Sequence, residues 1–394
     1  MSDKLHVNII KNGTSRCPST DSSLYFRCPC HKEGVTVHMT SRRSLISLVF
    51  ALLPLTAVSQ EVEIDFSNGK SMYDAWCGRC HGLDGKGIVA EELELEAPPP
   101  DFSDCSFNSR EPRKDWKAVI THGGQARGLS MSMPAWGEAL TEKQIDLMIE
   151  HIKTFCPDRS WPQGELNFRR AQVTAKAFPE NEALLIPTYT HAGARTSTTR
   201  FVYEERIGPK GQWEVSLPFS SNHSSSVNGL GDIEVAGKIL LHDDLRTLSV
   251  VSAGLEVGLP TGDASSGLGS GTWKLVPFLA AGKDFGPFFL QSSIKYEHPL
   301  KGNEKELVYA LAFTYPLIDG KKGLIPMLEF HGITSLGEGH TTLFLTPQLY
   351  VGLVKRGHIA LSIGTQFPVA GEKLFDYRIV AFFLWEYADG GLWW

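Results

Sequence analysis

The sequence predicts a multidomain protein, in which a small all-α domain is followed by an all-β, antiparallel transmembrane barrel of about 12 strands. Apolar residues recur at helical spacing between residues 69 and 155, whereas segments of alternating apolar and polar residues fill 183–387. The cysteines also separate the two parts, because none lies beyond residue 156. They are Cys17, Cys28, Cys30, Cys77, Cys80, Cys105 and Cys156.

Length and charge limit the possible functions. A chain of 394 residues is long enough for two or three domains. We place a helical domain at 61–157, a linker at 158–182 and the barrel at 183–394. The formal net charge is −6 and no stretch forms a basic block, so we expect no nucleic-acid partner.

Residues 39–59 have the pattern of a secretory signal peptide. Arg42 and Arg43 precede an apolar run at 45–55 and then a small-residue segment that ends near Ser59. The run is too short for a membrane-spanning helix, which needs about 20 residues. We therefore expect translation to begin at Met39, which makes 1–38 a non-native, disordered extension. The alternative is a small metal site at 28–31, although its Cys-x-Cys-His spacing fits neither a zinc pair nor haem attachment.

The strongest chemical signal is Cys77-Gly78-Arg79-Cys80-His81. Cysteines at i and i+3 lie on the same side of a helical turn, as two thioether bonds to one haem require. His81 follows on the same turn and can reach the iron. In an exported protein, Cys-x-x-Cys-His indicates covalent attachment of c-type haem. We expect one haem c, bound through Cys77 and Cys80, with His81 as an iron ligand.

The second iron ligand is expected from the loop that follows residue 122. Met133 precedes a proline, which keeps it extended rather than helical. A thioether ligand raises the reduction potential by stabilising ferrous iron. We favour Met133 and keep Met131, His122 or no second protein ligand as alternatives.

Two helices are expected around this loop, and a disulfide beyond them. The first covers 115–120, and the second begins after Thr141, with Gln144 completing a capping box only loosely. The apolar face of the second helix should pack against a helix that begins at Gly69, and we expect His151 on its solvated side. We predict that Cys105 and Cys156 are bonded, because export permits disulfides; two free buried thiols are the alternative.

With these features, residues 66–156 resemble a small class I cytochrome c. The resemblance rests on the Cys77–His81 motif followed by Gly82, the prolines at 98–100, the Met133-Pro134 loop and the closing helix. It implies that a backbone carbonyl in 98–100 orients the imidazole of the proximal histidine.

Residues 183–387 alternate in the manner of barrel strands. Along 233–241, for example, Ile233, Val235 and Ile239 oppose charged residues on the other face. Short turns and longer Gly/Ser loops follow one another in turn, as in outer-membrane barrels. We expect aromatic girdles at the strand ends, and a lumen in which charged side chains pair. The girdle residues are Tyr203, Phe219, Trp273, Tyr296, Trp385 and Tyr387, and the lumen residues are Arg200, Glu204, Arg206, Glu214, Lys238, Glu256, Lys295 and Arg378.

The barrel segment resembles the outer-membrane family named for the phenol meta-pathway, through the stretches at 229–234, 258–263 and 267–271. The resemblance implies a barrel, leaves transport open as its role and does not identify a substrate. A soluble β-sandwich or barrel is the alternative, because the pattern alone does not say which face points outward.

Geometry then limits how the two parts can cooperate. Twelve strands about 4.8 Å apart and tilted by about 40° enclose roughly 24 Å between backbones, so a domain roughly 30 Å wide cannot enter. A single haem also cannot bridge a hydrocarbon core of about 30 Å. We therefore expect a one-electron carrier anchored at the outer membrane, with its haem domain in the periplasm.

The expected partners are periplasmic redox proteins, outer-membrane lipid and a small solute in the barrel. The sequence favours electron transfer and leaves an enzymatic activity open. Two alternatives remain. One resembles fused cytochrome–porin proteins that oxidise Fe(II) or another extracellular donor. The other is a solute channel or transporter with a redox-sensing haem domain.

Overall fold

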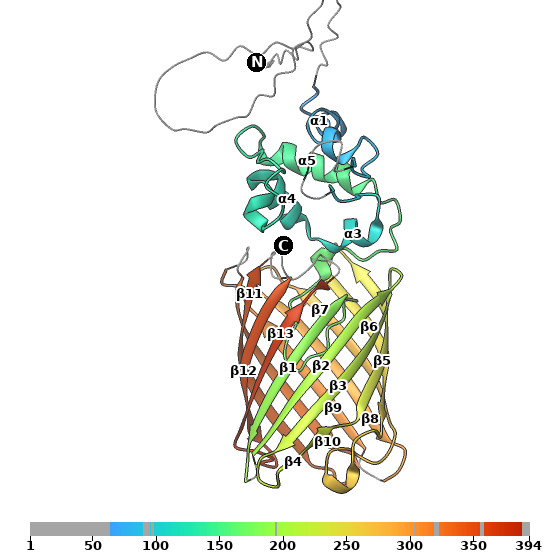
Figure 1. Ribbon diagram of the computed structural model, residues 1–394, viewed down its shortest axis with the longest axis vertical. Coiled ribbons are helices and arrows are strands. Elements are labelled where there is room, and N and C mark those ends of the chain that lie inside the picture. The colour runs from blue at the N-terminus through green and yellow to red at the C-terminus, as the bar shows by residue number, and fades with distance from the viewer. Residues whose placement is uncertain are drawn as a thin grey trace, which may run out of the picture. The chain divides into compact units, whose positions relative to one another are not determined.

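A computed structural model describes residues 64–89, 95, 98–193, 195–302, 305–318, 323–354 and 358–387 (Figure 1). The chain divides into two units, 1–64 and 65–394, and the second unit contains both the helical domain and the barrel. The expected N-terminal extension at 1–38 and signal peptide at 39–59 lie outside the described residues. None of the described helices is long and apolar enough to cross a bilayer.

Within its described residues, the helical domain contains five α-helices, three of which begin with a side-chain cap. The five helices are α1 (Gly69–Trp76), α2 (Gly78–His81), α3 (Cys105–Arg110), α4 (Arg113–His122) and α5 (Glu142–Lys153). The Asn68 side chain caps α1 by accepting the N–H groups of Lys70 and Ser71. Thr141 and Gln144 form a complete capping box at α5, which is tighter than the sequence suggested. Helix α4 is longer than the expected 115–120.

Helices α1 and α5 cross at close range. A Cβ atom on Gly69 would lie 2.1 Å from the Leu147 carbonyl oxygen, so only glycine permits this crossing. Met72 and Tyr73 of α1 are fully buried. They pack in a domain core to which α5 contributes the apolar face expected from its sequence, namely Ile145, Met148, Ile149 and Ile152.

One expectation about α5 is wrong. His151 does not lie on a solvated face, because its ring centroid is 5.2 Å from that of Tyr73 and 5.0 Å from that of Phe155. Burial lowers the pKa of His151, and its Nε2 atom is buried without a hydrogen-bond partner among the described residues. Helical spacing alone does not show the rings of Tyr73 and Phe155, which pack against the His151 side chain and shield part of it from solvent.

The second domain is a closed antiparallel barrel. Its strands are β1 (Glu182–His191), β2 (Arg195–Ile207), β3 (Gly211–Asn222), β4 (Val227–Leu230), β5 (Ile233–Asp244), β6 (Ser249–Leu259), β7 (Lys274–Asp284), β8 (Phe289–Pro299), β9 (Glu306–Thr314), β10 (Leu324–Ser335), β11 (Thr341–Val354), β12 (Ile359–Ala370) and β13 (Tyr377–Trp385). Pairing of β1 with β13 and of β2 with β3 closes the sheet (Figure 1).

Thirteen strand segments make a ring of twelve strands. Strand β3 pairs with β5 along 211–216 and with the short β4 along 219–222. Strands β4 and β5 therefore act as one strand, interrupted at Gly231 and Asp232. The expected count of about 12 is confirmed. Because the number is even, β1 begins and β13 ends at the same rim, where Ala183 pairs with Trp385.

The outer face of the barrel is apolar. On β5, Val235, Ile239 and Leu241 are 41–57 % exposed, while the alternate residue Leu240 is 3 % exposed. On β12, Leu361 and Ile363 are likewise exposed between buried neighbours. A soluble barrel would turn these side chains inward, so this exterior suits lipid rather than water. The exposure pattern excludes the soluble alternative.

Aromatic side chains gather where β1 begins. The ring of Tyr203 lies 5.4 Å from Trp213 and 5.3 Å from Tyr387, and Tyr387 lies 6.0 Å from Trp385. Tyr203 and Trp385 both pair with Ala183, so the cluster follows the rim. Such clusters mark the level of the membrane interface.

Residues 164–181 enter the lumen, and we call this segment the plug. It begins with the short 3₁₀ helix η3 (Gly164–Leu166). Two apolar clusters hold it against the wall. In one, Leu166, Phe168, Ala177 and Phe178 pack on Leu240, Val250 and Ala280. In the other, Ala171 packs among wall residues that include Leu184, Met327 and Phe382.

Charged groups fasten the plug more specifically. Arg170 donates to Glu182 at 2.9 Å and also to Glu204, and both carboxylates are buried. Lys176 forms ion pairs with Glu180 at 2.7 Å and Glu182 at 3.0 Å.

Glu329 on β10 holds the middle of the plug. Its carboxylate accepts the backbone N–H groups of three consecutive residues, 172–174, at 2.8–3.2 Å. The segment expected as a linker therefore fills part of the lumen.

We expect Arg170→Met to destabilise the barrel by about 3–5 kcal/mol, because it leaves the buried Glu204 carboxylate without a cation and Glu182 with Lys176 alone. Urea unfolding in detergent micelles measures the change. Arg246→Met is the matched control, since Arg246 is 92 % exposed beside Asp244 and should change stability by less than about 0.5 kcal/mol. Equal unfolding midpoints for the two variants would contradict the role of the plug.

Candidate haem site

The Cys-x-x-Cys-His motif forms the helical turn that the sequence predicts. The N–H groups of Cys80 and His81 donate to the Cys77 carbonyl oxygen at 3.1 and 2.9 Å. Cys77 is buried, Cys80 is half-buried, and both thiols are free. Burial raises the pKa of the Cys77 thiol to about 12, so it is protonated at neutral pH. One turn therefore presents two thiols and an imidazole together.

The His81 imidazole is prepared to bind a metal. Burial lowers its pKa to about 4, so the ring is neutral at pH 7 and has a free lone pair. The ring stacks on Phe102 with centroids 4.6 Å apart and an interplanar angle of 16°. Its Nδ1 atom is buried and has no hydrogen-bond partner among the described residues. The expected hydrogen bond to a carbonyl in 98–100 is therefore not formed in the structure.

The chain after the motif turns back onto it. Gly82 adopts a φ of 72°, which favours glycine, and its carbonyl oxygen accepts the Tyr73 hydroxyl at 2.8 Å. The N–H of Gly87 then donates to the His81 carbonyl oxygen at 2.9 Å, and that of Ile88 to the Cys80 carbonyl oxygen at 3.0 Å. These bonds fix the position of the motif within the domain.

Met133 lies in a loop that is tied to α4. The N–H of Gly124 donates to the Met133 carbonyl oxygen at 3.0 Å, and the N–H of Trp136 donates to the Ile120 carbonyl oxygen at 2.9 Å. Met133 is half-buried, whereas Met131 is 75 % exposed. Of the two methionines considered from sequence, Met133 is therefore the one held within the fold.

A stacked pair of indole rings joins this loop to the motif. Trp76 is the last residue of α1, directly before Cys77, and Trp136 lies three residues after Met133. Their centroids are 5.6 Å apart and their planes differ by 29°. No sequence pattern indicated this contact, although each tryptophan lies close in sequence to a candidate haem residue.

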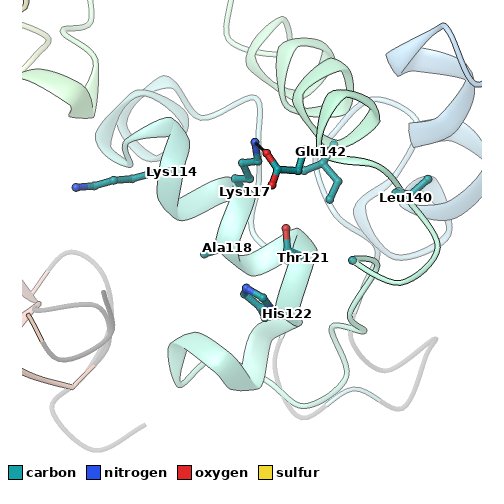
Figure 2. A pocket seen from close by; sticks show the side chains of 9 residues that line it. Lys114, Lys117, Ala118, Thr121, His122, Leu140 and Glu142 are labelled. Atoms are coloured by element: carbon teal, nitrogen blue, oxygen red, sulfur yellow. Dashed lines mark hydrogen bonds and ion pairs between the residues drawn. The ribbon is translucent and has the colours of Figure 1, made fainter. Parts of the chain in front are cut away.

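His122, the other alternative ligand, lines a pocket of about 410 Å³ between α4 and the start of α5 (Figure 2). Lys117 crosses this region and pairs with Glu142 at 3.1 Å and Asp146 at 3.2 Å. Neither the cysteines of the motif nor His81 nor Met133 lines this pocket.

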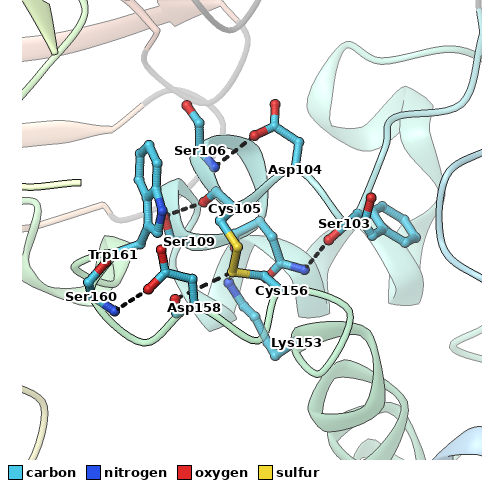
Figure 3. Close-up of a disulfide and its surroundings, with 12 residues drawn as sticks. Ser103, Asp104, Cys105, Ser106, Ser109, Lys153, Cys156, Asp158, Ser160 and Trp161 are labelled. Atoms are coloured by element: carbon cyan, nitrogen blue, oxygen red, sulfur yellow. Dashed lines mark hydrogen bonds between the residues drawn. A yellow bond between two sulfur atoms is a disulfide. The ribbon is translucent and has the colours of Figure 1, made fainter. Parts of the chain in front are cut away.

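Cys105 and Cys156 are joined in a disulfide, which links α3 to the end of α5 (Figure 3). Asn108 supports the same junction, because its side-chain amide donates to the carbonyl oxygens of Phe102 at 2.8 Å and Ile152 at 3.0 Å. Phe102 also stacks on His81. The disulfide therefore stabilises the segment that packs against the proximal imidazole.

Comparisons with known proteins agree with the two-part fold. Residues 65–152 match the family model described as cytochrome c oxidase, cbb3-type, subunit III. Residues 182–377 match the model described as putative MetA-pathway of phenol degradation. Chloroplastic cytochrome c6 from Chlamydomonas reinhardtii is 22 % identical over 144 residues, which are 36 % of this chain and 88 % of that protein.

Two solved barrels are similar to the second domain. An outer-membrane channel from Pseudomonas putida F1 is 11 % identical with a TM-score of 0.41, and the match covers 55 % of this chain and 98 % of that one. The KdgM porin is 8 % identical with a TM-score of 0.35, and the match covers 52 % and 99 %.

The protein is thus a cytochrome c domain followed by a closed 12-strand barrel of the outer-membrane type. The barrel part of the chain, 182–377, is the part that matches the family model of the putative MetA-pathway of phenol degradation.

The residues present fit a haem c. Two free thiols on one turn, followed by a neutral imidazole with an unpartnered ring nitrogen, are the donor set that this group requires.

The plug is the functional segment that sequence reasoning missed most completely. Its signal was composition: 164–181 contains arginine, lysine and phenylalanine among apolar residues, and only one glycine and one proline, unlike a flexible linker.

We expect the denatured but unreduced apoprotein, with Cys77 and Cys80 replaced by alanine, to show no thiol from Cys105 or Cys156. Cys105→Ala should destabilise the domain by about 2–4 kcal/mol, because the bond closes a long loop in the unfolded chain. Thiol titration and urea unfolding measure the two effects. Two reactive thiols from these positions would contradict the disulfide.

Proposed function

We propose that this protein is a one-electron carrier with a single covalent haem c, anchored at the outer membrane and facing the periplasm. The observation that carries the proposal is the turn at Cys77–His81, with two free thiols and a half-buried, neutral imidazole. Cys77 and Cys80 would attach the haem through thioether bonds, and His81 and Met133 would be its iron ligands.

The domain's own residues suit electron transfer. Bound haem supplies one reversible electron at its iron. The hydrogen bonds from Gly87 and Ile88 hold the motif, and the Phe102 ring fixes the plane of the His81 imidazole. A rigid ligand set changes little between oxidation states, which favours exchange with partner proteins. The chemistry favours soluble redox proteins as those partners.

The plug supports an anchoring role for the barrel. Phe168 and Phe178 are buried in the lumen, and Arg170 bridges two wall carboxylates there. A wide aqueous path is incompatible with this packing. The barrel is therefore proposed chiefly as a membrane anchor, and any solute it passes must be small.

Loop lengths support the orientation. At the rim where β1 begins, the connections 208–210, 245–248 and 285–288 have three or four residues, and the exception is 315–323 with nine. Those at the opposite rim include the longer segments 260–273, 300–305 and 371–376. Short turns are periplasmic in outer-membrane barrels. The plug connects the haem domain to the start of β1. The haem domain is therefore proposed to lie on the periplasmic side, after export by the signal peptide at 39–59.

The two other functions make different predictions. Oxidation of Fe(II) or another extracellular donor requires electrons to enter from the opposite rim, across a hydrocarbon core of about 30 Å. A redox-sensing transporter requires a lumen that opens when the haem changes oxidation state. The plug favours neither function.

We expect haem staining of fractionated cells to give one band in the outer membrane, with a reduced-minus-oxidised spectrum of a c-type cytochrome. His81→Ala should lose the spectrum while the barrel still inserts, which separates the haem site from membrane assembly. A haem band confined to the soluble fraction would refute the anchored carrier.

Intact cells distinguish the donors. Fe(II) added outside should leave the haem oxidised on a timescale of seconds, whereas a reduced periplasmic cytochrome supplied to spheroplasts should reduce it. Rapid reduction by external Fe(II) would support the surface oxidase instead. Solute flux in liposomes that follows haem redox state would support the transporter.

A further inference from the structure

The two segments that carry the candidate haem ligands have few direct ties. The Met133 loop forms its backbone hydrogen bonds with α4 or within itself: Trp136 and Gly137 donate to Ile120 and Thr121 at 2.9 and 3.0 Å. The motif forms its own with the loop at 82–88. Among the described residues, neither set of backbone hydrogen bonds connects Met133 to the turn that holds His81. A contact between the two segments must come from side chains.

The stack of Trp76 on Trp136 is such a contact. Trp76 is fixed by its place at the end of α1 and by Phe66, whose ring lies 5.6 Å away on the N-terminal side. Trp136 is fixed by its backbone, because its carbonyl oxygen also accepts the N–H groups of Ala139 and Leu140. The positions of Trp76 and Trp136 are therefore each supported by contacts other than the stack.

The rest of the loop has little apolar burial of its own. Leu129 is 41 % exposed and Met131 is 75 % exposed, on the two sides of Ser130. Both indole rings of the stack are half-buried. Stacking thus supplies apolar burial to a loop in which Leu129 and Met131 are exposed.

We propose that Trp76 and Trp136 form a clamp that holds the Met133 loop against the Cys77–His81 turn and so keeps the thioether on the iron. This inference rests on the proposed function, because it assumes that Met133 is the second axial ligand. The two tryptophans are positioning residues: they act through the loop and need not touch the iron.

The clamp acts on an equilibrium between a ligated loop and an open one. An aromatic pair of this kind favours the closed loop by roughly two- to tenfold in population. Removing one ring shifts the loop towards the open form, which exposes a coordination position. The ring of Trp76 is the better one to remove, because its backbone belongs to α1 and not to the loop.

The experiment compares four variants of the full-length protein in detergent. They are Trp76→Ala, Trp76→Phe, Met131→Ala and Met133→Ala. The rate of carbon monoxide binding to the ferrous haem reports an open position, and the weak sulfur-to-iron charge-transfer band of the ferric haem reports the thioether bond. Neither readout follows the stability of the domain alone.

We expect Trp76→Ala to bind carbon monoxide roughly two- to tenfold faster than the parent protein and to weaken the sulfur-to-iron band. Trp76→Phe should restore both signals, because it keeps an aromatic face. Met131→Ala is the matched control and should match the parent, since its side chain is exposed in the same loop. Met133→Ala should lose the band completely.

The outcomes separate the two hypotheses. If Met133→Ala keeps the band, the assignment of the axial ligand is wrong. If Met133→Ala loses it while Trp76→Ala matches the parent in both readouts, the clamp is wrong and the carrier function stands. Should Trp76→Ala fail to incorporate haem, Trp76→Leu keeps the apolar bulk without the aromatic ring, and parent-like behaviour of that variant would overturn the clamp.

Discussion

Charge compensation inside the barrel is the constraint on which the second domain depends. Glu182 and Glu204 are buried on the wall, and Arg170 of the plug bridges both of them. A buried carboxylate without a partner costs several kcal/mol, so this wall is not a stable surface by itself. Glu329 extends the argument, because its carboxylate is satisfied largely by backbone N–H groups of the plug. The plug and the strands therefore form one folding unit, although they are separate in sequence.

The sequence predicted the barrel and not the plug, for a physical reason. Lipid on one side and polar groups on the other impose a period of two on every strand, which a single strand already shows. The plug has no period, because its contacts are made individually. The bond from Val173 to Glu329 spans 156 residues, and no local pattern announces such a pair. His151 failed for a related reason: Tyr73 and Phe155 determine its environment, and only tertiary packing brings Tyr73 there.

The haem site likewise combines features that the sequence predicts with features that depend on tertiary contacts. Cys77, Cys80 and His81 are adjacent in sequence, so helix geometry alone places them on one turn. The disulfide was predictable as well, since Cys105 and Cys156 are the pair that remains once 1–38 is set aside and Cys77 and Cys80 are assigned to the haem. The support of the site was less accessible. The Phe102 ring beside His81 and the stack of Trp76 on Trp136 join segments separated by 20–60 residues. Sequence patterns thus identified the donor atoms, and the structure adds what holds them.

The plug also explains how a narrow barrel and a small haem domain can form one functional protein. Nine residues separate Cys156, which is locked to α3, from Leu166, which is already packed in the lumen. Such a tether spans at most about 35 Å when fully extended. The free part of the tether is shorter still, because the Glu165 carboxylate accepts the N–H of Arg113 at the start of α4. The helical domain is therefore held near one rim of the barrel. On the proposed function, electron exchange would depend on which partners reach that rim, and the filled lumen fits a barrel that acts chiefly as an anchor.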